Sequence, residues 1–400
     1  MIRALVRLLF VAVIATVFVA GAFGGGFVVS RQFFAPAPLP DGGAPADWKP
    51  YMPVYWEAWN YVHQDFYKTP IDDSQLVNSS IDGMVNALGD PNTRFVDAKT
   101  SAITSSDLSG SFEGIGATVE MKEGRLTVVS PIKGTPADKA GILPGDIILQ
   151  VDDTVIQNMD VMQAIRLIRG PRGTEVKLVI QRAKQPNLTL TLKRETIRVP
   201  FVEARMIEGT TIAYLRLNDF GATAPDEMRA ALQELNAQKP TGLIFDLRRN
   251  PGGYLNVSVE VASQFLKQGQ VVLIEKFKDG RKQEFKAARG GLATEIPMVL
   301  LVDKGSASAS EIVAGAIKDY KRATIIGTVT FGKGSVQNVH TLSDKSELRV
   351  TIARFFSPLD HEIHHVGITP DIEVTISDDD LAAKRDPQLG KAVEILTGKK

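Results

Sequence analysis

Met298-Val-Leu-Leu-Val302, followed by Asp303-Lys-Gly-Ser-Ala-Ser-Ala-Ser-Glu311, is the stretch that decides how this chain folds. The first five residues are all apolar, which predicts a strand in a protein core. After Ser308, apolar residues recur at helical spacing, namely Ile312, Val313, Ala316 and Ile317. The pattern therefore predicts a strand that leads through a short turn into a helix.

From Thr196 onward, the chain alternates between strand and helix patterns. Strands are predicted over residues 212–217, 242–247, 271–276, 298–302, 324–327 and 348–355. Helices are predicted over residues 224–237, 257–266 and 309–320. Such alternation is typical of an α/β domain, which we place at residues 196–376, with a helical segment over residues 377–400.

Ser308 lies at the turn between strand and helix, beside backbone N–H groups that no helix carbonyl satisfies. Those N–H groups suit the oxyanion of an acyl transfer, which makes Ser308 a candidate nucleophile. The alternative is that Ser308 only caps the helix, a role that serine fills well. Ser306 and Ser310 share the same run, and the residues alone do not choose among the three serines.

Lys333 is a candidate base for such a serine, because no histidine occurs between Lys304 and Gln337. A lysine accepts a proton only when its surroundings lower its pKa, and Gly332 and Gly334 allow a close approach to another element. The alternative is an exposed lysine in a turn. Gln337 is a candidate for holding the amine in place, and its alternative is a solvated surface amide.

The run from Gly327 to Lys333 also fits Gly-x-x-x-x-Gly-Lys, which is most of a phosphate-binding loop. Gly334 stands where the magnesium-binding serine or threonine belongs, Ser335 comes one position late, and no helix pattern follows. These departures argue against nucleotide binding.

Asn250-Pro-Gly-Gly253 ends the predicted strand over residues 242–247. This turn can present free backbone N–H groups, which an oxyanion needs. The alternative is a tight turn with no further role.

Residues 106–195 form a separate β-rich module with two short helices. The runs Gly114-Ile-Gly-Ala117 and Ala140-Gly-Ile-Leu-Pro-Gly-Asp-Ile-Ile148 resemble a PDZ domain. The resemblance implies that Gly114, Ile115, Gly116 and Ala117 bind the terminal carboxylate of a peptide that adds a strand to the sheet edge. The alternative is a small β-barrel without a ligand.

Further motifs follow in order from about Val54: Asp90-Pro-Asn-Thr-Arg-Phe95, Asp246-Leu-Arg-Arg-Asn-Pro-Gly-Gly253, Ser306-Ala-Ser-Ala-Ser-Glu311, Thr330-Phe-Gly-Lys-Gly-Ser-Val-Gln337 and Gly367-Ile-Thr-Pro-Asp371. With the PDZ module they resemble the C-terminal processing (tail-specific) proteases. The resemblance implies a peptidase core of the ClpP/crotonase-like type. It also implies Ser308 as nucleophile, Lys333 as base and Gln337 as the residue that positions the lysine.

By the same resemblance, the oxyanion donors are the backbone N–H of Ala309 and that of Gly252 or Gly253. Arg169 is similar to the arginine with which PDZ domains of this family sense a bound tail and contact the active site. Taken alone, Arg169 is a solvated charge.

The 46 basic and 46 acidic residues cancel, and no basic surplus points to nucleic acid. The absence of cysteine excludes disulfides, thiol nucleophiles and cysteine metal sites. His361, His364 and His365 with Glu362 are candidate metal ligands, but consecutive histidines point in different directions along a strand. We therefore predict a polar loop there, no metal and no cofactor.

Residues 1–33 carry Arg3 and Arg7 before an uncharged run of 22 residues from Leu8 to Val29. Because about 20 residues span a bilayer, this run predicts a transmembrane anchor. Ala20-Gly-Ala22 leaves a cleaved signal open, and a buried core helix is the remaining alternative. Either an anchor or a signal places the rest of the chain outside the cytoplasmic membrane.

Residues 34–50 hold five prolines and two glycines, which predicts an extended tether. Residues 51–105 form a helical region. Its helices are predicted over residues 54–66 and 74–88, the second with Val77, Ile81 and Val85 facing inward. These helices and the segment 386–396 are candidates for pairing between subunits, so we expect a homo-oligomer.

Together these patterns predict a membrane-tethered serine endopeptidase of the cell envelope, secreted if the signal is cleaved, that cuts exposed C-terminal tails through an acyl-enzyme. The expected partners are substrate tails, the membrane and an activating adaptor protein. The alternative is a PDZ adaptor with an inactive peptidase core. Intact Ser308, Lys333 and Gln337 argue against that alternative.

Overall fold

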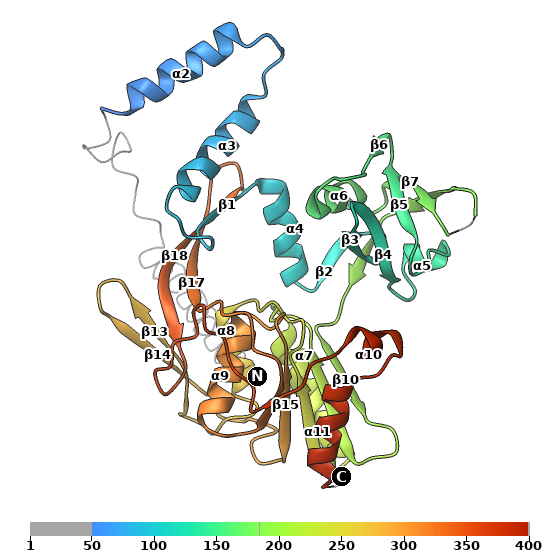
Figure 1. Cartoon of the computed structure of the whole chain (residues 1–400), viewed down its shortest axis with the longest axis vertical. Helices are drawn as coiled ribbons and strands as arrows, with labels where there is room; N and C mark the ends of the chain where they lie inside the picture. The colour runs from blue at the N-terminus through green and yellow to red at the C-terminus, as the bar shows by residue number, and fades with distance from the viewer. Residues whose placement is uncertain (1–49, 184, 399–400) are drawn as a thin grey trace, which may run out of the picture. The chain divides into compact units, whose positions relative to one another are not determined.

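The computed structural model describes residues 50–183 and 185–398 (Figure 1). The chain divides into two compact units, Met1–Gln75 and Leu76–Lys400. The predicted anchor or signal over residues 1–33 and nearly all of the tether lie outside the described residues. Within the described part of the chain, no helix is long and apolar enough to cross a membrane.

The predicted helical region contains α2 (Met52–Asp65), α3 (Asp73–Asn86) and α4 (Ala98–Leu108), with the short strand β1 (Arg94–Val96) before α4. Helix α2 has no buried residue, although it is rich in aromatic side chains. In α3, Val85 is buried but Val77 is 44% exposed, so the prediction that Val77 faces inward is wrong. The core contacts of α3 are confined to its last turn.

The PDZ module is built on a sheet with the strand order β3-β4-β5-β7-β8. Its elements are β3 (Ala117–Lys122), β4 (Arg125–Pro131), α5 (Pro136–Lys139), β5 (Ile147–Val151), β6 (Thr154–Val155), α6 (Val161–Ile168), β7 (Glu175–Gln181) and β8 (Leu188–Lys193). Strand β3 lies at the edge of this sheet. A separate antiparallel pair, β2 (Ser111–Gly114) and β9 (Glu195–Arg198), joins the chain entering the module to the chain leaving it.

The α/β core is a six-stranded sheet with the order β10-β11-β12-β15-β16-β19. Its strands are β10 (Val202–Met206), β11 (Ile212–Leu217), β12 (Gly242–Asp246), β15 (Met298–Val302), β16 (Thr324–Gly327) and β19 (Ile372–Glu373). All neighbours are parallel except β10 and β11. Helices α7 (Ala224–Ala237), α8 (Leu255–Ala262) and α9 (Ala309–Asp319) cover one face, and α11 (Pro387–Thr397) covers the other.

The side chains of the central strands alternate between these two faces, as the pleat requires. In β15, for example, Leu300 belongs to the cluster with α7, α8 and α9, whereas Leu301 belongs to the cluster with α11. Ala392 of α11 is fully buried against this sheet. Leu389, Ala392, Val393 and Leu396 of the segment 386–396 therefore pack against the sheet of the same chain.

A second sheet has the order β1-β18-β13-β14, with β17 also paired to β18. Its other strands are β13 (Val271–Phe277), β14 (Lys282–Lys286), β17 (Ser335–Thr341) and β18 (Glu347–Phe356). A short helix, α10 (Asp378–Ala382), precedes α11. Because β1 pairs with β18, the Asp90–Phe95 motif is joined to the sheet that follows Lys333.

Several predicted elements begin and end where expected, among them β11, β15, β16 and α7. The helix predicted over residues 257–266 is wrong at both ends, because α8 spans Leu255–Ala262. Phe265 and Leu266 remain buried after the helix ends. The apolar pattern therefore continues past the last helical turn and does not mark where it stops.

Candidate active site

The candidate site lies where β12 and β15 end, because the carboxyl ends of neighbouring parallel strands meet at one edge of a sheet. The turn after β12 and the turn after β15 are joined by hydrogen bonds to the carbonyl oxygen of Asn250. It accepts from the Ala307 N–H at 3.0 Å and from the Ser310 hydroxyl at 2.9 Å. The structure thus brings the two predicted turns into contact.

Ser308 is the N-cap residue of α9, as the alternative interpretation predicted, but its backbone is not that of an ordinary cap. Its φ is 54° and its ψ is −112°, whereas N-cap residues usually adopt the β region. Positive φ at a residue other than glycine is uncommon, and such conformations cluster at functional sites. The cap position and the nucleophile assignment are therefore compatible.

The other two serines of the run have structural roles. The Ser306 hydroxyl donates to the carbonyl oxygen of Leu247 at 2.8 Å, and the Ser310 hydroxyl donates to that of Asn250. Both residues are fully buried, whereas Ser308 is partly exposed. The structure thus supplies a physical reason to favour Ser308 that the sequence did not contain.

The glycine turn differs between its two glycines. The Gly252 N–H already donates to the Asn250 side-chain oxygen at 2.9 Å. A Cβ at Gly252 would lie 2.8 Å from Cβ of Ser308, so only glycine fits there. In the described part of the chain, the N–H groups of Gly253 and Ala309 donate to no protein atom. Gly253 and Ala309 are therefore the free donors beside Ser308.

Glu311 holds the loop of Ser308 and the loop of Lys333 together, and we did not predict this role from the sequence. Its Oε1 accepts from the Thr330 hydroxyl and from the Gly332 N–H, both at 2.6 Å. Its Oε2 accepts from the Ser308 N–H at 2.9 Å and from the Lys333 N–H at 2.8 Å. The spacing Ser-x-x-Glu of a capping box was the signal that could have revealed it.

Lys333 has the electrostatic surroundings that a neutral lysine needs. Burial lowers the pKa of its ammonium group, and the guanidinium groups of Arg94 and Arg349 lower it further. The Glu311 carboxylate acts in the opposite direction. Arg94 and Arg349 face each other across β1 and β18, which explains why both charges act on one lysine.

The glycines beside Lys333 allow the close approach that the sequence predicted. A Cβ at Gly334 would lie 2.5 Å from the backbone nitrogen of His364, and one at Gly332 would lie 3.1 Å from the carbonyl carbon of His365. The loop 361–365 therefore packs against the backbone of Lys333. The loop of Lys333 is followed by a strand, β17, and not by the helix that a phosphate-binding loop requires.

Gln337 makes a different contact from the one that we expected. Its side-chain amide donates to the Ser335 hydroxyl at 2.7 Å. Ser335 begins β17, two residues after Lys333, and an irregularity in the pairing of β17 with β18 lies between Val336 and Gln337. In this structure Gln337 thus supports the strand that follows Lys333 and does not bond the amine.

The histidine loop forms contacts within the protein. His361 pairs with Asp319 at 3.0 Å, and the rings of His364 and His365 lie 3.9 Å apart. Among residues 50–183 and 185–398, no cluster of three or more histidine, aspartate or glutamate side chains is placed to hold a metal ion.

Asp246 and Arg248 of the Asp246–Gly253 motif form a buried ion pair at 2.6 Å. Asp246 also accepts from the Tyr214 hydroxyl at 2.8 Å, which together with burial raises the pKa of Tyr214 to about 12. Arg248 reaches Asp386, just before α11, at 2.9 Å. These groups fix the start of the glycine turn and the C-terminal helix.

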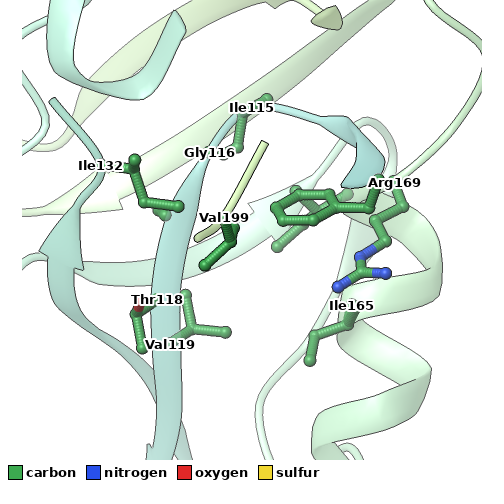
Figure 2. Close-up of a pocket in the computed structure, with 11 residues that line it drawn as sticks. Ile115, Gly116, Thr118, Val119, Ile132, Ile165, Arg169 and Val199 are labelled. Atoms are coloured by element: carbon green, nitrogen blue, oxygen red, sulfur yellow. The ribbon is translucent and has the colours of Figure 1, made fainter. Parts of the chain in front are cut away.

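The PDZ module contains a pocket next to the predicted carboxylate loop. The N–H groups of Ile115 and Gly116 donate to no protein atom within the described residues. An apolar cavity of about 250 Å³ adjoins them (Figure 2). It is lined by residues that include Val119, Ile132 and Ile165. The pocket therefore combines free backbone donors with apolar walls, as a PDZ ligand site requires.

Arg169 lines the same pocket. Its guanidinium pairs with Asp107 of α4 at 2.7 Å and lies 4.1 Å from the centre of the Phe112 ring. Arg166 of α6, the helix that ends just before Arg169, pairs with Asp97, the N-cap residue of α4, at 3.2 Å. In this structure Arg169 is thus bound to α4 and not to Ser308 or Lys333.

Residues 211–374 match the family model described as peptidase family S41, and residues 127–182 match that of the PDZ domain. The carboxy-terminal processing protease CtpA of Bacillus subtilis is 37% identical over 322 residues, which are 80% of this chain and 68% of that protein. The chain belongs to the carboxy-terminal processing protease family. It is a serine-type peptidase, and the PDZ domain of this protease fits the binding of C-terminal tails.

Other relatives agree with this assignment. The carboxy-terminal-processing protease of Bartonella bacilliformis is 40% identical over 313 residues, 77% of this chain and 71% of that protein. The solved photosystem II D1 C-terminal processing protease matches with a TM-score of 0.52 and 29% identity, over 82% of this chain and 95% of that one. A putative S41 protease from Bacteroides fragilis has a TM-score of 0.56, 16% identity and coverages of 84% and 92%, and supports the fold alone.

Glu311→Gln tests whether this carboxylate assembles the site. A glutamine side chain keeps one acceptor oxygen, so two of the four buried donors lose their partner, each at a cost of about 1–3 kcal/mol. We expect a loss of kcat/KM of about 100-fold or more, together with a lower melting temperature. Glu234→Gln, on the exposed side of α7, is the matched control. Catalysis close to wild type in a folded Glu311→Gln enzyme would contradict this role.

Arg94→Met tests the electrostatic control of Lys333. Removing this positive charge raises the pKa of Lys333, so the amine becomes neutral at a higher pH. We expect the midpoint of the rising limb of kcat/KM against pH to move up by about half a unit to one unit at low salt. Arg125→Met, an exposed arginine of the PDZ module, should leave the midpoint in place. An unchanged or lower midpoint in Arg94→Met would show that Arg94 does not act on the lysine.

Proposed function

We propose that this protein is a membrane-tethered, extracytoplasmic serine endopeptidase that captures exposed C-terminal tails in its PDZ pocket and cleaves them with Ser308 and Lys333. The observation that carries the proposal is the pair of hydrogen bonds that Glu311 Oε2 accepts from the backbone N–H groups of Ser308 and Lys333. One carboxylate oxygen thereby holds the backbone of the proposed nucleophile close to that of the proposed base.

In the proposed reaction, neutral Lys333 accepts the hydroxyl proton of Ser308 as Oγ attacks the carbonyl carbon of the scissile peptide bond. The negative charge that develops on the carbonyl oxygen is stabilised by the N–H groups of Ala309 and Gly253, which have no protein partner among the described residues. Gly252 serves as the spacer that lets this turn approach Ser308.

Collapse of the tetrahedral intermediate breaks the C–N bond, and the Lys333 ammonium gives its proton to the leaving amine. A water molecule then attacks the acyl-enzyme while Lys333 accepts its proton, and Lys333 returns that proton to Ser308 Oγ as the ester bond breaks. The lowered pKa of Lys333 favours the neutral amine that starts each half-reaction. Gln337 has a positioning role, which it exerts here through Ser335.

Tail capture uses groups of the PDZ domain. The Ile115 and Gly116 N–H groups take the terminal carboxylate, and the free edge of β3 pairs with the backbone of the tail. The last side chain enters the apolar cavity of about 250 Å³. This lining favours tails that end in an apolar residue of moderate size. Arg169, at the edge of the pocket, is placed to respond to a bound tail.

The location follows from the N-terminal sequence, in which Arg3 and Arg7 precede the uncharged run from Leu8 to Val29. An uncleaved run anchors the protease in the cytoplasmic membrane with its catalytic part outside, and a cleaved run releases it. Growth of cells followed by membrane fractionation and N-terminal sequencing distinguishes the two forms.

A serine-reactive fluorophosphonate probe tests the nucleophile. We expect labelling in the presence of a tail peptide to disappear in Ser308→Ala, because no other hydroxyl of the run is free. Ser306→Ala and Ser310→Ala lose a buried hydrogen bond, so they should be less stable and still react.

Lys333→Ala is tested by measuring tail-peptide binding and peptide cleavage side by side. We expect normal binding and no turnover, which separates the role of the base from that of the binding site. Normal labelling of Ser308→Ala, or normal turnover of Lys333→Ala, would exclude the dyad and point to another nucleophile or base. A parent protein that binds tails but neither reacts with the probe nor cleaves would favour the inactive-adaptor alternative.

Ile165→Asp tests the tail pocket. A carboxylate in this apolar lining repels the carboxylate of the tail and loses apolar contact, so we expect binding of a peptide with an apolar last residue to weaken about tenfold or more. Val155→Asp, at a position that is 65% exposed on β6, is the matched control. Equal binding of the free-acid and C-terminally amidated peptides would show that the carboxylate is not recognised.

A further inference from the structure

Val199 lines the tail pocket although it does not belong to the PDZ sheet or its helices. It lies in the connector between β9, which ends at Arg198, and β10, which begins at Val202. Figure 2 shows its side chain among the lining residues, in this view between Ile132 and Arg169 and nearer to Gly116 than to Ile165. The pocket itself is bordered by Thr118 and Val119 of β3 and by Ile165 of α6. That space is the groove into which a PDZ ligand adds its strand.

We propose that Val199 acts as an internal competitor for the tail pocket, so that the resting connector and a bound tail cannot occupy the groove together. This inference rests on the proposed capture of tails by the PDZ domain. An apolar, β-branched side chain in this groove makes the contacts that the last residue of a tail would make. The tail must therefore displace Val199 before it can pair with β3.

The connector is built so that Val199 can move. Val199 is 37% exposed, and its N–H donates to the Gly110 carbonyl oxygen at 3.1 Å. Two residues later the chain is firmly held, because Phe201 is 5% exposed and its N–H donates to Glu227 at 2.7 Å. Displacement of Val199 thus bends a short span between the β2–β9 pair and a fixed point on the core.

The fixed point touches the loop that supports the oxyanion turn. The Phe201 carbonyl oxygen accepts from the Asn218 N–H at 2.8 Å, and the Phe201 ring leaves no room for a Cβ at Gly221. In the same loop, the Phe220 N–H donates to the Gly252 carbonyl oxygen at 2.8 Å. A tail that pushes on Val199 therefore acts on a chain of packed groups that ends beside Ser308.

The experiment is a fluorescence-anisotropy titration of the full chain, carrying Ser308→Ala to prevent cleavage, with a labelled peptide that ends in valine. Removing two methyl groups of a competitor should strengthen tail binding, so we expect Val199→Ala to lower Kd by about three- to tenfold. Val199→Phe should raise Kd by a similar factor. Val155→Ala, exposed on β6, is the control and should match the parent.

The sign of the Val199→Ala effect decides the inference. A competitor gives tighter binding, whereas an ordinary wall residue gives weaker binding because the tail loses a contact. Weaker or unchanged binding by a folded Val199→Ala protein therefore overturns the proposal. Val199→Thr, which keeps the shape but lowers the apolar character, should also bind more tightly, and it serves if the alanine variant unfolds.

Failure of the underlying function gives a different result. If the parent protein binds no tail peptide, and Ile165→Asp and the Val199 variants behave alike, tail capture itself is wrong. If the parent binds and Ile165→Asp does not, but Val199→Ala binds no better than the parent, only the competitor role is wrong.

Discussion

Four hydrogen bonds to the buried carboxylate of Glu311 join the loop of Ser308 to the loop of Lys333. A charged group without partners is very costly in a protein interior. If either loop moved away, the Glu311 carboxylate would lose hydrogen bonds that it needs while buried. Helix α9 follows β15 of the six-stranded sheet, whereas the loop of Lys333 leads from β16 of that sheet into β17 of the second sheet. The carboxylate is what makes them one site.

The rest of the core supplies the frame for this contact. Parallel strands β12 and β15 end side by side, and Asn250 bridges the turns that follow them. Asp246 and Arg248 anchor the first turn to Asp386 and so to the C-terminal helix. Within this motif, the ion pair of Asp246 and Arg248 fixes the backbone, and the glycine turn presents a free N–H group at Gly253. Phe201, two residues after Val199 of the PDZ pocket, packs against Gly221 in the loop that is hydrogen-bonded to this turn.

Most of the α/β core and the PDZ domain could be predicted because their elements carry strong local signals. The apolar strand Met298–Val302 and the helix Ala224–Ala237 have the predicted bounds because their apolar pattern stops where the element stops. The helix predicted over residues 257–266 spans Leu255–Ala262 instead. Its end was misplaced because buried apolar residues continue after the helix ends. Val77 was misplaced because periodicity indicates an apolar face and not whether anything covers it.

The sequence by itself determined the family, the order of the motifs and the identity of Ser308 and Lys333 as candidates, since these depend on residue type and spacing. Only the tertiary structure decided which hydroxyl and which N–H groups are free. The Ser306 hydroxyl is occupied by a hydrogen bond to the carbonyl oxygen of Leu247, 59 residues away, and Glu311 acquires its role from donors 19 to 22 residues further along the chain. Hydrogen-bond satisfaction is a property of the folded neighbourhood, because a donor is free or occupied only once distant segments have been brought together.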